Sequence, residues 1–159
     1  NVVGCTNVNG DMKDIVNISD TSVVIVDGVE INRIDQGLLV FVGVFAEDTE
    51  AEVEKLASKI AKLRIFCDER GKMFYSVADI GGEVLLISNF TLCANVRKGN
   101  RPEFLNAARP AEAERLYEAL AERLNTYVTT KGGVFGGDMK IEAHNDGPVT
   151  IIIDSDDLA

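Results

Sequence analysis

The sequence predicts a single domain of the α+β or layered α/β class, built on a mixed β-sheet, and three observations predict it. A tight-turn signal joins two strand-like runs near residue 27, several short runs are apolar throughout, and two segments carry an apolar stripe at helical spacing. In chain order these segments alternate as strands, helix, strands, helix and strands. A length of 159 residues fits one compact domain, and 46% apolar with 26% charged residues is typical of a globular protein.

The first predicted element is a β-hairpin. Residues 23–26 and 29–31 flank Asp27-Gly28, a pair that tolerates the positive φ angles of a type I′ turn. Further strands are expected over residues 38–44, 84–87 and 149–153, which read LLVFVGV, VLLI and VTIII. Because these runs are apolar throughout and short, we expect strands that are covered on both faces.

Two helices are expected between the strands. The first carries an apolar stripe, and Thr49 followed by Glu52 predicts a capping box at its start. The second begins near Pro110, a residue that suits the first helical turn. We interpret both stripes as faces that pack on the core; they consist of Val53, Leu56, Ile60 and Leu63 in the first helix, and Leu116, Tyr117, Leu120 and Leu124 in the second.

Composition excludes several classes of function. The 16 Lys and Arg residues against 26 Asp and Glu residues give a net charge of −10, which argues against broad nucleic-acid binding. Cys5, Cys67 and Cys93 form no C-x-x-C pair, so neither a disulfide framework nor a cysteine zinc site is expected, and free thiols suit the cytoplasm. The single His144 leaves one candidate base, for which a structural role is the favoured interpretation. No apolar run approaches the length of a membrane span.

A polar cluster follows the strand expected over residues 84–87, in the segment SNFTLCANVRKGNRPEF (88–104). Thr91 and Cys93 are candidate nucleophiles, but neither has a base nearby in the sequence, and a buried, inert Cys93 is the favoured interpretation. The cations Arg97, Lys98 and Arg101 lie within five residues. They form either a phosphate-binding patch or a solvated turn.

A second polar cluster, HNDGP (144–148), separates two strand-like runs near the end of the chain. Asn, Asp, Gly and Pro all favour an ordinary turn. A cis peptide bond at Gly147-Pro148 is the alternative, and the residues themselves do not decide between the two.

Together these segments resemble the D-aminoacyl-tRNA deacylases, also called D-tyrosyl-tRNA deacylases. The resemblance rests on GLLVFVGV, KLRIF, GGEVLLISNFTL, RKGNRP, LYEAL, FGGDM and NDGPVT. Two of these correspond to the family's signatures, a Ser-Gln-Phe-Thr-Leu segment and an Asn-x-Gly-Pro-x-Thr segment. The match runs from about Met12 to Asp154, so residues 12–159 are interpreted as the deacylase domain and residues 1–11 as an unmatched N-terminal extension.

The resemblance implies a β-β-α layered domain that acts as a cytoplasmic homodimer, with active sites at the subunit interface. The implied reaction is hydrolysis of the ester that joins a D-amino acid, or glycine, to the terminal adenosine of tRNA. No metal or organic cofactor and no membrane partner are implied. The implied site residues fall into three groups: Ser88, Asn89, Phe90 and Thr91 as catalytic residues; Gly147, Pro148, Gly137 and Met139 for substrate binding and chiral selection; and Arg97, Lys98 and Arg101 for tRNA phosphates.

The family's mechanism implies that backbone N–H groups near Phe90 stabilise the oxyanion, while a tRNA 2′-hydroxyl helps to activate water. Thr91 is then a positioning residue rather than a nucleophile. The Gly147-Pro148 pair, implied to be cis and to enter the partner's site, would exclude L side chains by steric clash.

Three positions depart from the family pattern. Asn89 stands where the family has Gln, Gly137 where it has Ala, and Asn17-Ile18 where it usually has Gln-Arg. These changes bear on rate and substrate range rather than on the fold. Two other functions therefore stay open: a dimer that binds tRNA or other nucleic acid with reduced or lost activity, and a structural dimer without a nucleic-acid role.

Overall fold

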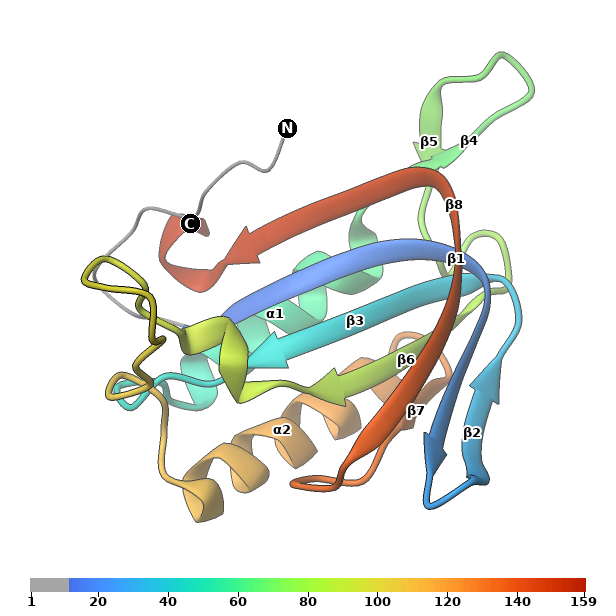
Figure 1. Ribbon diagram of the computed structural model, residues 1–159. Coiled ribbons are helices and arrows are strands. Elements are labelled where there is room, and N and C mark those ends of the chain that lie inside the picture. Colours follow the sequence, from blue (N-terminus) through green and yellow to red (C-terminus); the bar gives the residue numbers. More distant parts are fainter. Residues whose placement is uncertain (1–11) are drawn as a thin grey trace.

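The computed structural model describes residues 12–159, which form eight strands, two α-helices and two short 3₁₀ helices (Figure 1). In chain order the elements are β1 (Lys13–Val26), β2 (Val29–Ile34), β3 (Gly37–Gly43), α1 (Glu50–Lys62), β4 (Phe66–Cys67), β5 (Met73–Tyr75), β6 (Glu83–Ser88), η1 (Phe90–Cys93), α2 (Pro110–Asn125), β7 (Thr130–Gly132), β8 (Met139–Asp154) and η2 (Ser155–Asp157).

The long strand β1 organises a six-stranded sheet. Its first half pairs with β3 and its second half with β2, while β8 follows its other edge over almost its whole length. These pairs are antiparallel, whereas β3 with β6 and β6 with β7 are parallel. The result is one mixed sheet, bent until it is nearly closed, with β8 curving along β1 (Figure 1). The predicted mixed α/β single domain is confirmed.

The local signals are also confirmed. Asp27 and Gly28 have φ angles of 51° and 77°, and they join β1 to β2 as a tight hairpin turn. Both halves of the capping box at Thr49 are present, and α2 begins at Pro110.

Two apolar clusters lie on opposite faces of the sheet. The larger cluster packs α1 and α2 against one face; on β3 it includes Val40 and Val42. The smaller cluster is built around Leu39, with Phe41 packed against it, so it uses the alternate side chains of β3. The two-sided burial expected for residues 38–44 and 84–87 is confirmed.

The same expectation is wrong for residues 149–153. Ile153 is buried, but Ile152 is 46% exposed because nothing in the described chain covers that side of β8.

The segment 144–148 is a bulge within one strand rather than a turn between two strands. Asn17 of β1 pairs with Thr150, but Ser19 pairs with Asn145, so the four residues 146–149 on the β8 side lie opposite the single residue Ile18. The Gly147-Pro148 peptide bond is cis, and Gly147 has a φ of 112°. The described part of the chain contains no helix that is both long and apolar enough to cross a membrane.

Candidate functional site

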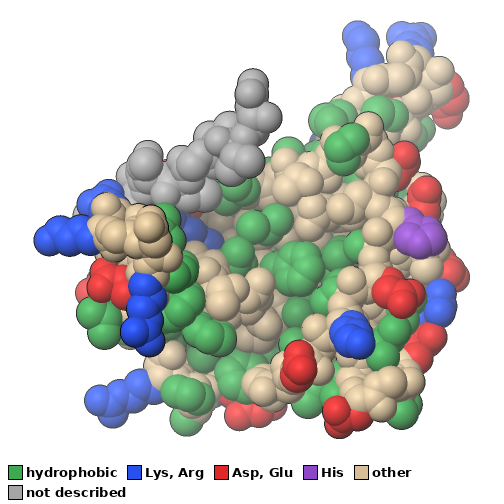
Figure 2. Space-filling model, in the orientation of Figure 1, with side chains coloured by type: hydrophobic (Ala, Val, Ile, Leu, Met, Phe, Trp, Pro, Cys, Tyr) green, Lys and Arg blue, Asp and Glu red, His purple; other side chains and the backbone are tan. Residues whose placement is uncertain are grey.

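A cleft of about 570 Å³ opens where β6 runs into η1. Its apolar floor belongs to the smaller core cluster and includes Phe41, Ile87 and Ile141. Figure 2 shows hydrophobic side chains gathered in the middle of this face of the sheet, with Lys and Arg mostly at its periphery. The remaining lining residues are Ser88, Asn89, Phe90, Ala107, Ala108, Pro110, Ala113, Phe135, Gly136, Gly137, Asp138 and Met139.

Asn89 starts the 3₁₀ helix η1 at one wall of the cleft. Its backbone N–H donates to the Val42 carbonyl at 2.8 Å, which fixes the turn to the end of β3. Its Oδ1 accepts the Thr91 N–H at 3.3 Å and the Thr91 hydroxyl at 2.5 Å. The amide oxygen is therefore used as an N-cap of its own turn.

Phe90 presents both a ring and a backbone donor at this wall. Its side chain is 58% exposed and meets Phe104 edge to face, with 5.1 Å between ring centroids. Its N–H has no hydrogen-bond acceptor within residues 12–159. A donor without a partner next to a cleft is suited to bind a carbonyl oxygen or an oxyanion.

The opposite wall is the turn that precedes β8. Gly136 has a φ of 70°, and the Gly137 N–H donates to the Val134 carbonyl at 3.0 Å. A Cβ at Gly137 would lie 3.2 Å from Val134 Cβ, Cγ1 and O, so an Ala here would require Val134 to shift. Because Gly137 has no side chain, Val134 can keep its position.

The cleft brings together five of the eleven residues that the resemblance implied: Ser88, Asn89, Phe90, Gly137 and Met139. Thr91 does not line the cleft, although its hydroxyl is bonded to Asn89. Gly147 and Pro148 are exposed on the β8 bulge and do not line the cleft of their own chain.

The three implied phosphate contacts, Arg97, Lys98 and Arg101, also lie outside the cleft lining, on an exposed loop.

Sequence reasoning missed the apolar part of the site. Phe41 lies in the middle of an apolar strand, and Phe135 precedes the paired glycines 136 and 137. Strict alternation along β3 would have separated Phe41 from Val40 and Val42 and placed it on the other face of the sheet.

Ionisable groups are scarce at the cleft, where Asp138 is the one titratable side chain among the lining residues. The predicted burial of Cys93 is confirmed: the side chain is 2% exposed, and burial raises the pKa of its thiol to about 12. Cys67 is exposed and free, His144 is exposed away from the cleft, and Cys5 lies outside the described residues. Within residues 12–159, no three His, Cys, Asp or Glu side chains cluster so as to hold a metal ion.

The third departure from the family pattern lies beneath the β8 bulge. Asn17 is buried, donates to the Leu39 carbonyl at 3.4 Å and accepts the Thr150 hydroxyl at 2.7 Å. Ile18 is 5% exposed and belongs to the larger core cluster. These residues therefore tie β1 to its neighbours.

Comparisons with known proteins agree on one family. Residues 15–154 match the profile of the family described as D-Tyr-tRNA(Tyr) deacylase. The chain is 55% identical over 132 residues to the D-aminoacyl-tRNA deacylase of Ruegeria pomeroyi, covering 82% of this chain and 91% of that protein. It is 47% identical over 146 residues to the D-aminoacyl-tRNA deacylase of Lacticaseibacillus casei, covering 91% and 99%.

Two solved structures have the same fold. One is named c-Myc DNA Unwinding Element Binding Protein; it has a TM-score of 0.85 and 39% identity, over 89% of this chain and 97% of that one. The other is described as a probable eukaryotic D-amino acid tRNA deacylase, with a TM-score of 0.77 over 90% of this chain and 98% of that one. At 14% identity, the second similarity concerns the fold alone.

Proposed function

Because this chain belongs to the D-aminoacyl-tRNA deacylase family, we propose that it is a hydrolase that cleaves the ester bond of D-aminoacyl-tRNA and of glycyl-tRNA. The products are the free amino acid and tRNA. The observation that carries the proposal is the cleft, where Ser88, Asn89 and Phe90 face Gly137 and Met139 across an apolar floor. The cytoplasm, where aminoacyl-tRNA is used, is the proposed location.

Hydrolysis needs little acid–base chemistry from the protein, because an aminoacyl ester is already reactive. Water adds to the ester carbonyl, the carbon–oxygen bond to the ribose breaks, and the departing ribose oxygen takes up a proton. The Phe90 N–H, which lacks an acceptor in the described chain, supplies a donor for the oxyanion. A neighbouring 2′-hydroxyl of the tRNA helps to activate the water, so Thr91 serves to hold Asn89 in place.

Chiral selection is assigned to the β8 bulge of a partner subunit in a homodimer, within the β-β-α layering of the family. Gly147 and Pro148 are exposed and lie outside their own chain's cleft, as expected of residues that reach across an interface. The uncovered Ile152 on the same strand is consistent with such an interface. The rigid bulge would leave room for hydrogen or a D side chain at the α-carbon and would clash with an L side chain.

The test is deacylation of D-Tyr-tRNA, Gly-tRNA and L-Tyr-tRNA, with Gly147→Val and a control, Asp146→Ala, one residue earlier on the bulge. A Cβ at Gly147 would lie 2.8 Å from both Val149 Cγ2 and Val149 N, at a φ of 112° that branched residues avoid, so the bulge must change shape. We expect loss of activity in Gly147→Val only, and survival of the L ester with the unmodified protein. Equal hydrolysis of D and L esters would refute steric selection.

A second candidate is a nucleic-acid-binding dimer with little or no turnover. It is favoured by the 39% identity to a protein named for binding a DNA element, and by Asn89 in place of Gln. Tight tRNA binding without deacylation would support this candidate. Turnover comparable to that of other deacylases would exclude it.

A further inference from the structure

The positive charges of this acidic chain are concentrated in one segment. Residues 55–74 contain six Lys or Arg residues and two carboxylates, for a net charge of +4. The other 139 residues carry a net charge of −14. We call the six cations the basic ridge: Lys55, Lys59, Lys62, Arg64, Arg70 and Lys72.

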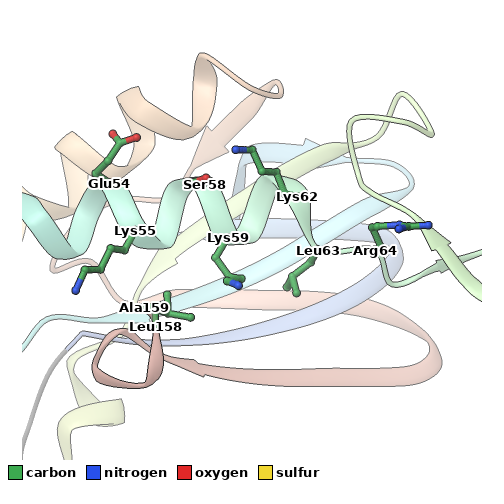
Figure 3. A pocket seen from close by; sticks show the side chains of 9 residues that line it. All are labelled: Glu54, Lys55, Ser58, Lys59, Lys62, Leu63, Arg64, Leu158 and Ala159. Carbon is green, nitrogen blue, oxygen red and sulfur yellow. The ribbon is translucent and has the colours of Figure 1, made fainter.

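The first part of the ridge lies on the second half of α1. Lys55, Lys59 and Lys62 are exposed and span about 10 Å along the helix axis. They line a groove of about 570 Å³ between α1 and the segment that ends at Ala159. In Figure 3, Lys55 and Lys59 point toward that segment, and Lys62 points to the other side of the helix.

Arg64 joins the helix to the β4–β5 hairpin, which stands clear of the body in Figure 1. Its Nε donates to the Phe74 carbonyl at 2.7 Å, and its guanidinium stacks 4.4 Å from the centroid of the Phe74 ring. Phe74 is still 47% exposed. At the hairpin tip, Asp68 accepts the backbone N–H groups of Arg70 and Lys72, so the turn that carries the last two cations is held rigid.

The ridge cations form no ion pair within residues 12–159, although the carboxylates of Glu52, Glu54 and Asp79 lie near Lys55, Lys62 and Arg64. Ion pairs in this part of the chain involve Lys13, Arg33, Arg115, Arg123 and Lys131, and none involves the ridge. The one carboxylate side chain lining the groove, Glu54, is paired with Arg123 at 2.5 Å. Asp156 and Asp157 precede the lining residue Leu158 but do not line the groove. The net charge of +4 over residues 55–74 is suited to a polyanion.

We propose that the basic ridge binds the sugar–phosphate backbone of the tRNA body. This inference rests on the proposed function, which supplies a polyanionic RNA substrate. Lys55 and Lys59 point to the same side of the helix and are about 6 Å apart along its axis, so they match about two successive phosphates of one strand. The exposed Phe74 ring, backed by Arg64, offers a stacking surface for an unpaired base.

The position of the ridge is compatible with an occupied cleft. α1 packs into the larger core cluster, whereas the cleft floor belongs to the smaller cluster on the other face of the sheet. RNA bound at the ridge therefore leaves the entrance of the cleft open.

The test compares Lys55→Gln/Lys59→Gln with Lys140→Gln/Arg33→Gln, which removes two exposed charges outside the ridge. Binding of a tRNA transcript without an attached amino acid is measured over a range of salt concentrations, and this measurement does not depend on catalysis. We expect the ridge variant to bind about 10-fold more weakly, with the slope of log K against log salt reduced by about 1–2. Its kcat on D-Tyr-tRNA should be unchanged while KM rises, and D-tyrosyl-adenosine, which lacks the tRNA body, should be hydrolysed at the normal rate.

Two results would overturn the proposal. One is unchanged tRNA binding in the ridge variant, and the other is an equal loss in the control, which would show an effect of net charge alone. If deacylation is absent but the ridge variant alone loses tRNA affinity, the ridge stands and the proposed reaction fails.

Discussion

Gly43 lies directly against the η1 turn at the candidate site. It is the last residue of β3, and it has no side chain where η1 crosses the strand end. A Cβ built on Gly43 would lie 2.8 Å from Leu92 Cβ, 3.2 Å from Cys93 Sγ and 3.4 Å from the Asn89 carbonyl oxygen. All three atoms belong to η1 or its cap, so Gly43→Ala acts directly on this turn.

The size of the displacement follows from these contacts. Carbon atoms in contact lie about 3.5–4.0 Å apart, so η1 must move by about 0.7 Å or more to accept a methyl group 2.8 Å from Leu92 Cβ. Overpacking of this kind costs about 1–3 kcal/mol of stability. A shift of about 1 Å in a reacting geometry costs about 100-fold in rate, so we expect kcat to fall by about 10- to 100-fold.

The assay is single-turnover deacylation of D-Tyr-tRNA, with urea unfolding of the same preparation. Gly82→Ala is the matched control: its Cβ would lie 3.0 Å from the Gln36 carbonyl oxygen, before the start of β6 and away from η1. We expect the control to lose stability but to keep its kcat per folded molecule. A folded Gly43→Ala protein with normal kcat would refute the reasoning, as would an equal loss of kcat in the control.

Three further predictions concern single buried or capping groups. Asp14 is fully buried without a hydrogen-bond partner in the described chain, and burial, with a smaller effect of Asp48, raises its pKa well above 3.8. Because the pKa of Asp14 is higher in the folded than in the unfolded state, its ionisation lowers the free energy of unfolding as the pH rises above about 4. Urea unfolding at pH 4.5 and pH 8 should show that this free energy falls less with pH in Asp14→Asn than in the unmodified protein. An equal fall in both proteins would contradict this. Iodoacetamide at pH 8 should modify exposed Cys67 but not Cys93, whose thiol pKa is about 12, and equal labelling by peptide mapping would disprove the assigned burial. Thr49→Ala should lower the unfolding free energy by about 1 kcal/mol at unchanged kcat, and a reduced kcat would tie the start of α1 to the site.

Local chemistry explains which elements the sequence predicted well. The Asp27-Gly28 turn, the Thr49 capping box and the start of α2 at Pro110 all depend on neighbours within a few residues. The exposure of Ile152 and the burial of Asp14 depend on which strand pairs with β1 and on what covers β8. The pairing of β1 with β8 joins residues more than a hundred positions apart, so no local sequence pattern predicts it.

The candidate site likewise contains residues that the sequence predicted and residues that it missed. The resemblance supplied Ser88, Asn89 and Phe90 as a group because they are consecutive in the chain. It also supplied Gly137 and Met139, and the fold brings these to the facing wall of one cleft. The apolar floor was missed because its residues look like ordinary core residues until the curvature of the sheet leaves one side of them open.

Asn89 changes the role of the side-chain amide at this position instead of removing it. Asn is among the best N-cap residues because its short side chain reaches the backbone N–H two or three positions ahead, and here Oδ1 binds both the N–H and the hydroxyl of Thr91. A Gln, longer by one methylene, is not a favoured N-cap, and its amide is freer to extend into the cleft. The chain thus has a turn that is fixed by its own side chain. Since the cap holds the backbone donor at Phe90, we expect the departure to alter which aminoacyl groups are accepted more than whether the ester is cleaved.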